Sequence, residues 1–190
     1  MDSSTHQKPF KGIFVGDSKS GKTSIIHRLV EGYELMDVSA TIGGSFKKFQ
    51  VDIEGKTVAM NLWDTAGQER FLSVTRPYFR NSSFAVLVYA IDDLISFESI
   101  EKWRKEVIST APPYVKLILL GNKSDLIEER AVNYVIAQKY ARENNFELFA
   151  EVSAKTGDGI EAAFYQIAGM HLQNSESAQI QRVEKKSGCC

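Results

Sequence analysis

Cysteine is almost absent from this chain of 190 residues, because Cys189 and Cys190 are the only two and stand at its last positions. No disulfide, zinc site or redox pair can form within the folded part, which fits the reducing cytosol. Proline is scarce, at four residues, and the chain has no repeat or low-complexity block. The sequence therefore predicts one continuous globular unit stabilised by a hydrophobic core.

Long apolar runs are missing too. The longest, such as Phe84–Ile91, is far short of the roughly 20 residues of a membrane-spanning helix, and the polar stretch 1–10 contains no signal-peptide core. Neither sign of charge dominates, since 23 Lys and Arg against 24 Asp and Glu give a net charge of −1. This balance argues against a globally basic nucleic-acid binder and against a polyanionic disordered chain.

Hydrophobic residues make up 43% of the chain, and their pattern predicts a mixed fold. Phe49, Val51 and Ile53 alternate with polar residues, as do Val58, Met60 and Leu62, with a Glu54-Gly55 turn between them, which predicts a hairpin. Short continuous runs predict parallel strands buried on both faces. These runs are Gly12–Val15, Phe84–Ile91, Val115–Leu120 and Phe146–Val152.

Segments with helical periodicity separate the predicted strands, and their apolar stripes are interpreted as core packing. The stripes are Phe97, Ile100, Trp103, Arg104 and Val107, then Val132, Val135, Ile136 and Tyr140, then Ile160, Phe164 and Ile167. Strands and helices that alternate around one antiparallel hairpin predict an α/β fold. We expect a six-stranded, mostly parallel sheet with one antiparallel edge strand and about five flanking helices.

A glycine-rich motif follows the first predicted strand and precedes an apolar helix. It fits the pattern G-x-x-x-x-G-K-[ST] of a P-loop NTPase and reads Gly16-Asp17-Ser18-Lys19-Ser20-Gly21-Lys22-Thr23, with Ser24 next. The glycines let backbone N–H groups converge on phosphate oxygens at the positive end of the helix dipole. Lys22 is expected to reach the β- and γ-phosphates and Thr23 to bind Mg²⁺. The competing interpretation is an accidental glycine turn.

Two further segments follow successive predicted strands, at the edge where open α/β sheets bind ligands. The first is Asn122-Lys123-Ser124-Asp125, and the second is Ser153-Ala154-Lys155. The Asp125 carboxylate can accept two hydrogen bonds from guanine N1–H and N2–H₂, donors that adenine lacks. The Lys123 stem can pack on the base, and a backbone N–H of the second segment can donate to guanine O6. Alone, each segment is better explained as a turn or a helix cap.

Four residues beyond these motifs are candidates for sensing the γ-phosphate. Asp64, in Trp63-Asp64-Thr65-Ala66-Gly67-Gln68-Glu69, can hold a water on Mg²⁺. The Gly67 N–H can approach the γ-phosphate, and Gln68 can orient the attacking water. The Thr41 hydroxyl, in Thr41-Ile42-Gly43, can complete the Mg²⁺ shell. The plain alternative is an ordinary loop threonine and a turn-forming aspartate.

Together, these elements in this order resemble the Rab family of Ras-like small GTPases, over roughly Lys11–Leu172. The resemblance implies a leader at 1–10, a GTPase domain at 11–172 and a flexible tail at 173–190. It implies GTP, GDP and Mg²⁺ as ligands, slow hydrolysis with Gln68 and Lys22 as catalytic residues, and two switch segments around Thr41 and Gly67. It also implies an aromatic triad, Phe46, Trp63 and Tyr78, as the surface that effectors recognise; the alternative is that these rings are simply buried in the core.

Some residues depart from that family's pattern. Lys19 stands where a small residue is usual, and its charge can touch phosphates or alter the exchange and hydrolysis rates. Gly44-Ser45 replace an apolar–acidic pair, and Ala90 replaces a common Asp. Glu34 occupies the position of the aromatic residue that stacks on the purine. Tyr33 is one residue away, and a local shift that places it over the base is an open alternative.

The tail ends in Ser187-Gly188-Cys189-Cys190, which is not a C-a-a-X box. It resembles a terminus that carries two prenyl groups on Cys189 and Cys190. Two lipid chains anchor a protein stably, whereas one does not. The expected location is therefore the cytoplasm, with cycling onto the cytosolic face of endomembranes.

The resemblance implies a monomer whose partners are an exchange factor, a GTPase-activating protein, a GDP-dissociation inhibitor or prenylation escort, and effectors. It implies no nucleic acid. The leading hypothesis is thus a switch that hydrolyses GTP and regulates vesicle traffic. A GTP/GDP-binding scaffold with little hydrolysis is the alternative, and a metabolic P-loop kinase is a third reading that the guanine-type segment disfavours.

Overall fold

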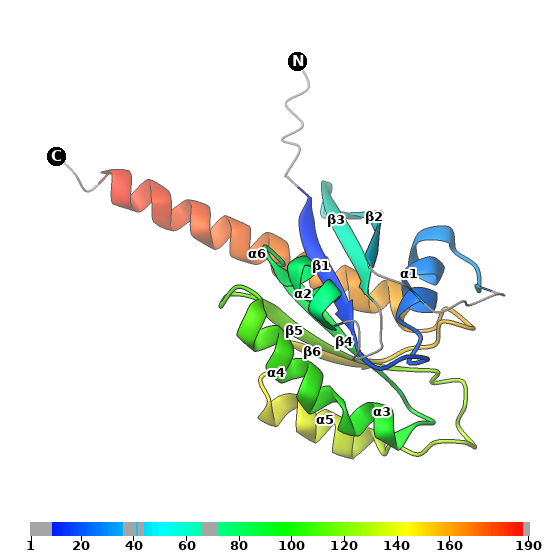
Figure 1. The fold of residues 1–190 in the computed structure, drawn as a ribbon. Helices are drawn as coiled ribbons and strands as arrows, with labels where there is room; N and C mark the ends of the chain where they lie inside the picture. Colours follow the sequence, from blue (N-terminus) through cyan, green and yellow to red (C-terminus); the bar gives the residue numbers. More distant parts are fainter. Residues whose placement is uncertain (1–8, 36–40, 42–43, 66–71, 188–190) are drawn as a thin grey trace.

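The computed structural model describes residues 9–35, 41, 44–65 and 72–187 (Figure 1). Its strands are β1 Phe10–Val15, β2 Gly44–Ile53, β3 Lys56–Thr65, β4 Phe84–Ala90, β5 Lys116–Asn122 and β6 Leu148–Glu151. Its helices are α1 Lys22–Glu31, α2 Leu72–Phe79, α3 Leu94–Glu98, α4 Ile100–Thr110, α5 Tyr134–Glu143 and α6 Ile160–Ser187. Strands and helices alternate after the first hairpin, as the hydrophobic pattern predicts.

The six strands of the described residues form one sheet in the order β2-β3-β1-β4-β5-β6. The pairs β1·β3, β1·β4, β4·β5 and β5·β6 are parallel, and β2 joins the edge of the sheet antiparallel to β3. The predicted fold class is thus confirmed. Because parallel strands share one direction, the loops after β1, β3, β5 and β6 leave the same edge of the sheet, where ligands bind in open α/β folds.

Alternate residues of the central strands pack into two separate cores, one on each face of the sheet. Phe14 and Val86 face α1 and α6, whereas Ile13, Leu87 and Leu119 face the opposite layer. Figure 1 shows α3, α4 and α5 side by side in that second layer. The continuous apolar runs are explained by this double burial, because no position of β4 faces water.

The hairpin turn lies where the sequence predicts it. Glu54 and Gly55 have φ angles of 50° and 77°, both in the left-handed region. Two successive residues of this kind form a turn whose twist matches the twist of the flanking strands. The register then pairs Ile53 with Lys56 and continues to Gly44 opposite Thr65, which carries β2 alongside the whole of β3.

Two helices differ from the predicted stripes. The segment around Phe97–Val107 is interrupted at Ser99, so α3 and α4 take the place of one expected helix. The stripe predicted around α5 is half right. Val132 is buried and Tyr140 packs against the second core, but Val135 and Ile136 are 67% and 60% exposed. The small residues Ala137 and Ala141 pack on the sheet instead, and a search for large apolar residues misses them. The stripe Ile160, Phe164 and Ile167 is buried as predicted.

Both ends of the domain differ from the expected boundaries. Phe10, assigned to the leader, is 7% exposed and begins β1. Helix α6 continues to Ser187, well past Leu172, where the sequence predicts that regular structure ends. The flexibility expected of 173–190 stays a prediction. Among the described residues, no helix is long and apolar enough to cross a membrane.

Candidate functional site

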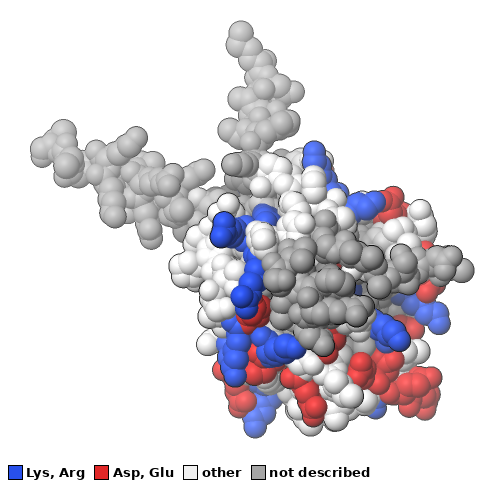
Figure 2. Space-filling model, in the orientation of Figure 1, with Lys and Arg blue, Asp and Glu red and all other residues white. Residues whose placement is uncertain are grey.

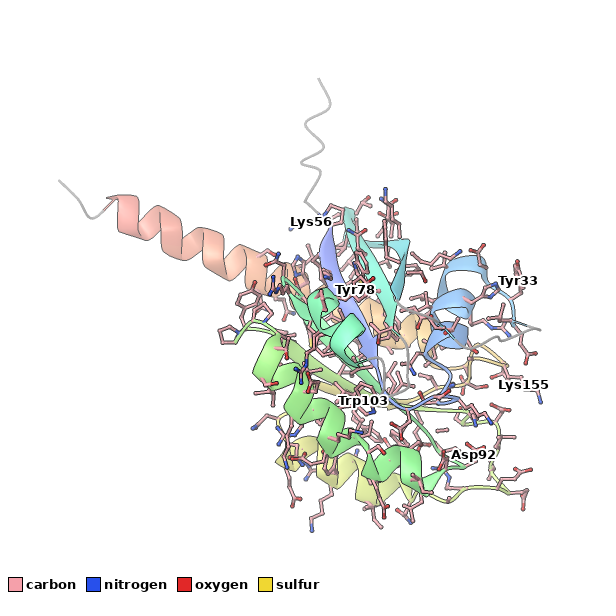
Figure 3. The ribbon with its side chains drawn as sticks, viewed as in Figure 1. Tyr33, Lys56, Tyr78, Asp92, Trp103 and Lys155 are labelled. Atoms are coloured by element: carbon pink, nitrogen blue, oxygen red, sulfur yellow. The ribbon has the colours of Figure 1, made fainter. Side chains whose placement is uncertain are left out.

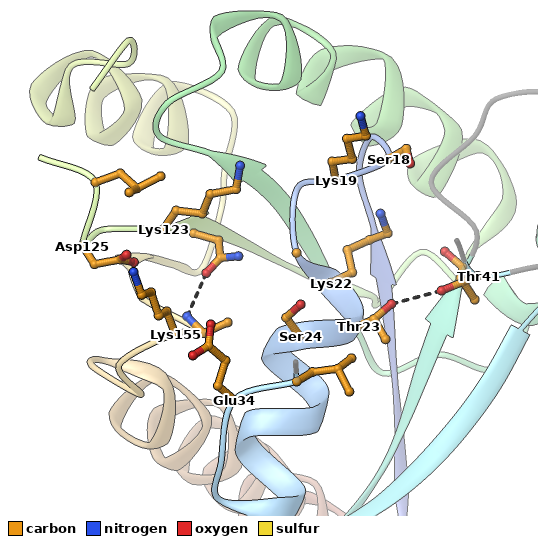
Figure 4. A pocket seen from close by; sticks show the side chains of 16 residues that line it. Ser18, Lys19, Lys22, Thr23, Ser24, Glu34, Thr41, Lys123, Asp125 and Lys155 are labelled. Carbon is orange, nitrogen blue, oxygen red and sulfur yellow. Dashed lines mark hydrogen bonds between the residues drawn. The ribbon is translucent and has the colours of Figure 1, made fainter. Parts of the chain in front are cut away.

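A pocket of about 550 Å³ opens at the edge where β1, β3, β5 and β6 end (Figure 4). Most of the predicted nucleotide-binding residues meet there. Its lining is Ser18, Lys19, Gly21, Lys22, Thr23, Ser24, Glu34, Leu35, Thr41, Thr65, Asn122, Lys123, Asp125, Leu126, Ala154 and Lys155. Segments more than a hundred residues apart in the chain therefore form one cavity, and Figure 4 shows Asp125 and Lys22 toward opposite ends of it.

The loop between β1 and α1 has the backbone that the glycine motif requires. Gly16 and Gly21 have φ angles of 142° and 93°. A Cβ atom at Gly16 would lie 2.1 Å from the Val88 carbonyl oxygen, and one at Gly21 would lie 2.0 Å from Asn122 Nδ2. Only glycine fits these positions, and α1 begins immediately afterwards with its N–H groups directed at the pocket.

Lys22 is held inside this loop. Its Nζ donates to the carbonyl oxygens of Gly16 and Asp17, both at 2.8 Å. Burial lowers the pKa of Lys22 to about 8, and the nearby carboxylates of Asp64 and Asp17 oppose that shift only in part. The loop thus carries a preorganised ammonium group at its centre, where an anionic ligand can exchange for the carbonyl contacts.

Three oxygen-bearing side chains converge beside Lys22. The Thr23 hydroxyl donates to Asp64 Oδ2 at 2.6 Å, Thr41 Oγ1 lies 3.2 Å from the same oxygen, and the two hydroxyls are 3.0 Å apart. Asp64 Oδ1 is buried without a partner among the described residues, and burial raises the pKa of Asp64. A buried, unpaired carboxylate oxygen beside two hydroxyls fits Mg²⁺, which prefers oxygen ligands and keeps places for phosphate and water.

That donor set contains a single carboxylate. Accordingly, the described part of the chain has no group of three or more His, Cys, Asp or Glu side chains that could hold a metal by themselves. Mg²⁺ sites of nucleotide-binding proteins use one or two carboxylates together with the ligand's phosphates, so the two findings agree.

The other end of the pocket is formed by the two loops that the sequence predicts to read a base. Asn122 does not face the cavity as a free amide: its Nδ2 donates to the Ser20 carbonyl at 2.9 Å, and its Oδ1 accepts from the Ala154 N–H at 3.1 Å. Asn122 therefore ties the phosphate loop to the loop after β6. Ser153 also acts indirectly, because its hydroxyl donates to Asp125 Oδ1 at 2.5 Å.

At this end of the pocket, the Asp125 carboxylate and the Lys123 side chain are placed to contact a ligand. No hydrogen bond involves Asp125 Oδ2 among the residues that the structure describes, so it can accept from a base. Lys123 has a φ angle of 67°, and its Nζ forms an ion pair with Asp92 at 3.0 Å, which holds its stem along the pocket wall. The sequence leaves open which N–H of the second loop donates to a base oxygen, and the Ala154 N–H already bonds to Asn122 Oδ1.

Tyr33 does not take the place of the missing purine-stacking aromatic. Its ring packs edge-on against His27 at 4.9 Å between centroids and is 60% exposed, at the outer edge of the molecule beside α1 (Figure 3). Glu34 and Leu35 line the pocket instead, and Figure 4 shows the Glu34 side chain near Lys155. The base end therefore has a carboxylate and an aliphatic side chain where related proteins are expected to have a ring.

Three residues hold the loops around the pocket although no sequence motif marks them for that role. Trp103, on α4, is 1% exposed, and its indole Nε1 donates to Asp17 Oδ1 at 2.7 Å. This bond holds the phosphate loop against α4. Asp92 holds Lys123, and Arg28 reaches the loop after β6. None of these three belongs to a motif, and only their spatial neighbours reveal what they do.

The predicted aromatic triad forms one cluster away from the pocket. The rings of Phe46 and Trp63 stack with centroids 5.1 Å apart, and Trp63 and Tyr78 are also 5.1 Å apart. Phe46 is 47% exposed, and the Lys11 ammonium lies 4.8 Å above the Trp63 ring. The three side chains come from β2, β3 and α2 and present a partly exposed aromatic surface, unlike a buried core.

Four predicted residues lie outside the described part of the chain, namely Gly67, Gln68, Cys189 and Cys190. Their proposed roles depend on the sequence alone. Thr41 is described, and it contacts Thr23 and Asp64 as a switch threonine is expected to do.

The sequence profile of the Ras family matches residues 11–173 of this chain. Human Ras-related protein Rab-4B is 38% identical over 184 residues, which cover 97% of this chain and 86% of the relative. Mouse Ras-related protein Rab-4A is 37% identical over 98% of this chain and 85% of the relative. Ras-related protein Rab-4 of Dictyostelium discoideum is 39% identical over 90% of this chain and 82% of the relative.

Proposed function

We propose that this chain, which belongs to the Ras family and within it to the Rab group of small GTPases, binds GTP and GDP with Mg²⁺ in the pocket described above. As a Rab-type GTPase it hydrolyses GTP slowly, acts as a molecular switch and regulates membrane traffic. The proposal concerns which residues of this chain perform each part of that cycle. The shape and chemistry of the pocket support it.

The phosphates are proposed to lie along 16–24. The backbone N–H groups of this loop and the start of α1 supply partial positive charge, and Lys22 supplies a full one. Thr23 and Thr41 would hold Mg²⁺ directly and Asp64 through a water. When bound, the ion neutralises charge that develops on the phosphate oxygens.

Guanine is proposed to bind at the other end of the pocket. The free Oδ2 of Asp125 would accept from the donors on N1 and N2, and the Lys123 stem would cover one face of the ring. An adenine there would leave the carboxylate unpaired, which costs about 1–3 kcal/mol or more for a charged group. Base choice thus depends mainly on Asp125.

The residues proposed to carry out hydrolysis are assigned from the resemblance to the small GTPase family. Gln68 would orient the attacking water, the Gly67 N–H would contact the γ-phosphate, and Lys22 would stabilise charge on the transferred group. Members of the family act with regulators and effectors. For this chain we propose an exchange factor, a GTPase-activating protein and effectors that contact the surface formed by Phe46, Trp63 and Tyr78.

The family implies association with endomembranes. We propose that Cys189 and Cys190 carry prenyl groups and that a GDP-dissociation inhibitor or escort protein keeps the protein cycling between cytoplasm and membrane. A nucleic-acid partner is not proposed, since the net charge is −1 and basic and acidic side chains are mixed over the face in Figure 2. The chain is proposed to act as a monomer.

One observation carries this proposal most directly: a free carboxylate oxygen and a buried ammonium group lie toward opposite ends of the same cavity. The test is to purify the full chain, extract its ligand and identify it by chromatography. We expect about one GDP or GTP per chain, and an Asp125→Asn variant that retains less of it. An adenosine compound in that place would refute the base assignment.

A hydrolysis experiment separates the switch from the scaffold alternative, which no observation favours. The protein is loaded with GTP, and phosphate release is followed in a single turnover with and without a GTPase-activating protein. Slow release that the added protein accelerates is expected. Absence of release under both conditions would contradict the roles given to Gln68 and Lys22.

A further inference from the structure

Arg28 projects from α1 to the loop that follows β6. Its Nε donates to the Ala154 carbonyl at 2.9 Å, its Nη2 donates to the Lys155 carbonyl, and its Nη1 donates to the Gly32 carbonyl at 3.1 Å. One guanidinium group thus binds three carbonyl oxygens, two of them 126 and 127 residues along the chain. Hydrogen bonds from a charged donor are stronger than neutral ones, so this contact is a firm anchor for the loop.

The orientation of one peptide unit follows from this contact. The Ala154 carbonyl and the Lys155 N–H belong to the same peptide unit, and no peptide bond of the described residues is cis. In a trans peptide the C=O and N–H point in opposite directions. Because the carbonyl points at Arg28, the Lys155 N–H points away from Arg28. Ala154 and Lys155 both line the pocket, so this donor is available to a ligand there.

The neighbouring donor is already used. The Ala154 N–H bonds to Asn122 Oδ1, whereas the Lys155 N–H has no acceptor among the residues that the structure describes. Gly157 of the same loop lies beside Arg28 and has a left-handed φ of 91°. The guanidinium therefore supports a peptide of this loop whose N–H has no acceptor among the described residues.

We infer that Arg28 is a positioning residue for guanine recognition, because it holds the Ala154–Lys155 peptide so that the Lys155 N–H donates to the oxygen on C6 of the base. The inference rests on the proposed function and adds a specific donor and the residue that aims it. Arg28 itself touches no ligand. Removing it leaves three carbonyls without their charged donor, two of them in this loop, and lets the peptide rotate.

The test compares two ligands that differ at one atom. GDP has an oxygen on C6, and 6-thio-GDP has a sulfur, which is a weak acceptor. We expect Arg28→Gln to lower GDP affinity about tenfold, the loss of one hydrogen bond to a well-placed donor, and to lower 6-thio-GDP affinity much less. Arg28→Lys, which keeps the charge but has one donor nitrogen in place of three, is expected to recover part of the GDP affinity.

Arg104→Gln is the matched control. Arg104 is also an arginine on a helix, where it forms an ion pair with Glu101 of α4, but it does not line the pocket. It is expected to leave both affinities unchanged. If Arg28→Gln weakens GDP and 6-thio-GDP equally, or weakens neither, the inference is overturned. If the unmodified protein binds neither guanine ligand, the proposed function itself fails, which is a different result.

Discussion

The two ends of the pocket are built in different ways. The phosphate end comes mostly from one continuous stretch, 16–24, whose glycines and helix start create the binding geometry locally. The base end comes from loops after β5 and β6 that are distant in sequence and are held by side-chain bonds from Asn122, Arg28 and the Asp92–Lys123 pair. The phosphate end can therefore be identified from a sequence motif, whereas the loops of the base end are also held by residues such as Arg28 and Asp92, which belong to no motif.

Replacing Lys22 tests the phosphate end and should have the largest effect. Lys22→Met removes the buried ammonium group that is proposed to face the phosphates, so we expect nucleotide affinity to fall by about 3–5 kcal/mol, or roughly a hundred-fold to several thousand-fold. GDP and inosine diphosphate should weaken alike, because the base end is intact. Titration calorimetry measures both, and Lys105→Met, on the exposed side of α4, is the control.

The lowered pKa of Lys22 adds a pH dependence. Below pH 8 the ammonium of the nucleotide-free protein is charged, and above pH 8 it loses its proton, so GDP affinity should fall as the pH rises from 7 to 9. Lys22→Arg stays charged over this range. Its affinity, though lower, should change little with pH, and parallel profiles for the two proteins would contradict this assignment.

Asp125→Asn tests the base end and should change the order of ligands more than the overall affinity. We expect GDP affinity to fall by about 1–3 kcal/mol, while xanthosine diphosphate gains, because its O2 then meets an amide donor. Competition binding with both ligands provides the measurement. Asp158→Asn, on an exposed loop residue outside the pocket, should leave the preference for guanine unchanged.

The smallest expected effect concerns the substituted stacking position. Glu34→Phe places a ring at the base end, and we expect GDP to dissociate a few-fold more slowly, since stacking on a base contributes at most about 1–3 kcal/mol. Stopped-flow release of a fluorescent GDP measures the rate. Tyr33→Phe, on the neighbouring exposed ring, should leave the rate as it is; faster release from Glu34→Phe would show that the position does not face the base.

Much of the fold follows from local patterns. The Glu54-Gly55 turn, the buried parallel strands and the antiparallel edge strand are all predicted correctly, because periodicity and turn chemistry act over a few residues. The errors have an equally physical origin. Helix α5 packs through Ala137 and Ala141, which a pattern of large side chains overlooks, and Val135 and Ile136 face water.

Tyr33 and Ala154 illustrate a second kind of limit. Sequence spacing places Tyr33 one residue from the base-stacking position, yet its ring packs on His27. The Ala154 N–H stands in the expected motif, yet it already bonds to the Asn122 side chain. A side chain one residue away, or a donor already occupied, cannot be recognised before its neighbours in space are known.

By itself, the sequence determined the family and the glycine-rich loop and predicted the carboxylate proposed to select guanine, because these depend on residue type and spacing within short segments. Only the tertiary structure decided how the two base loops are held. Their contacts join residues such as Arg28 and Lys155, which lie 127 positions apart. A bond between them exists only after the sheet has brought α1 and the end of β6 to the same edge.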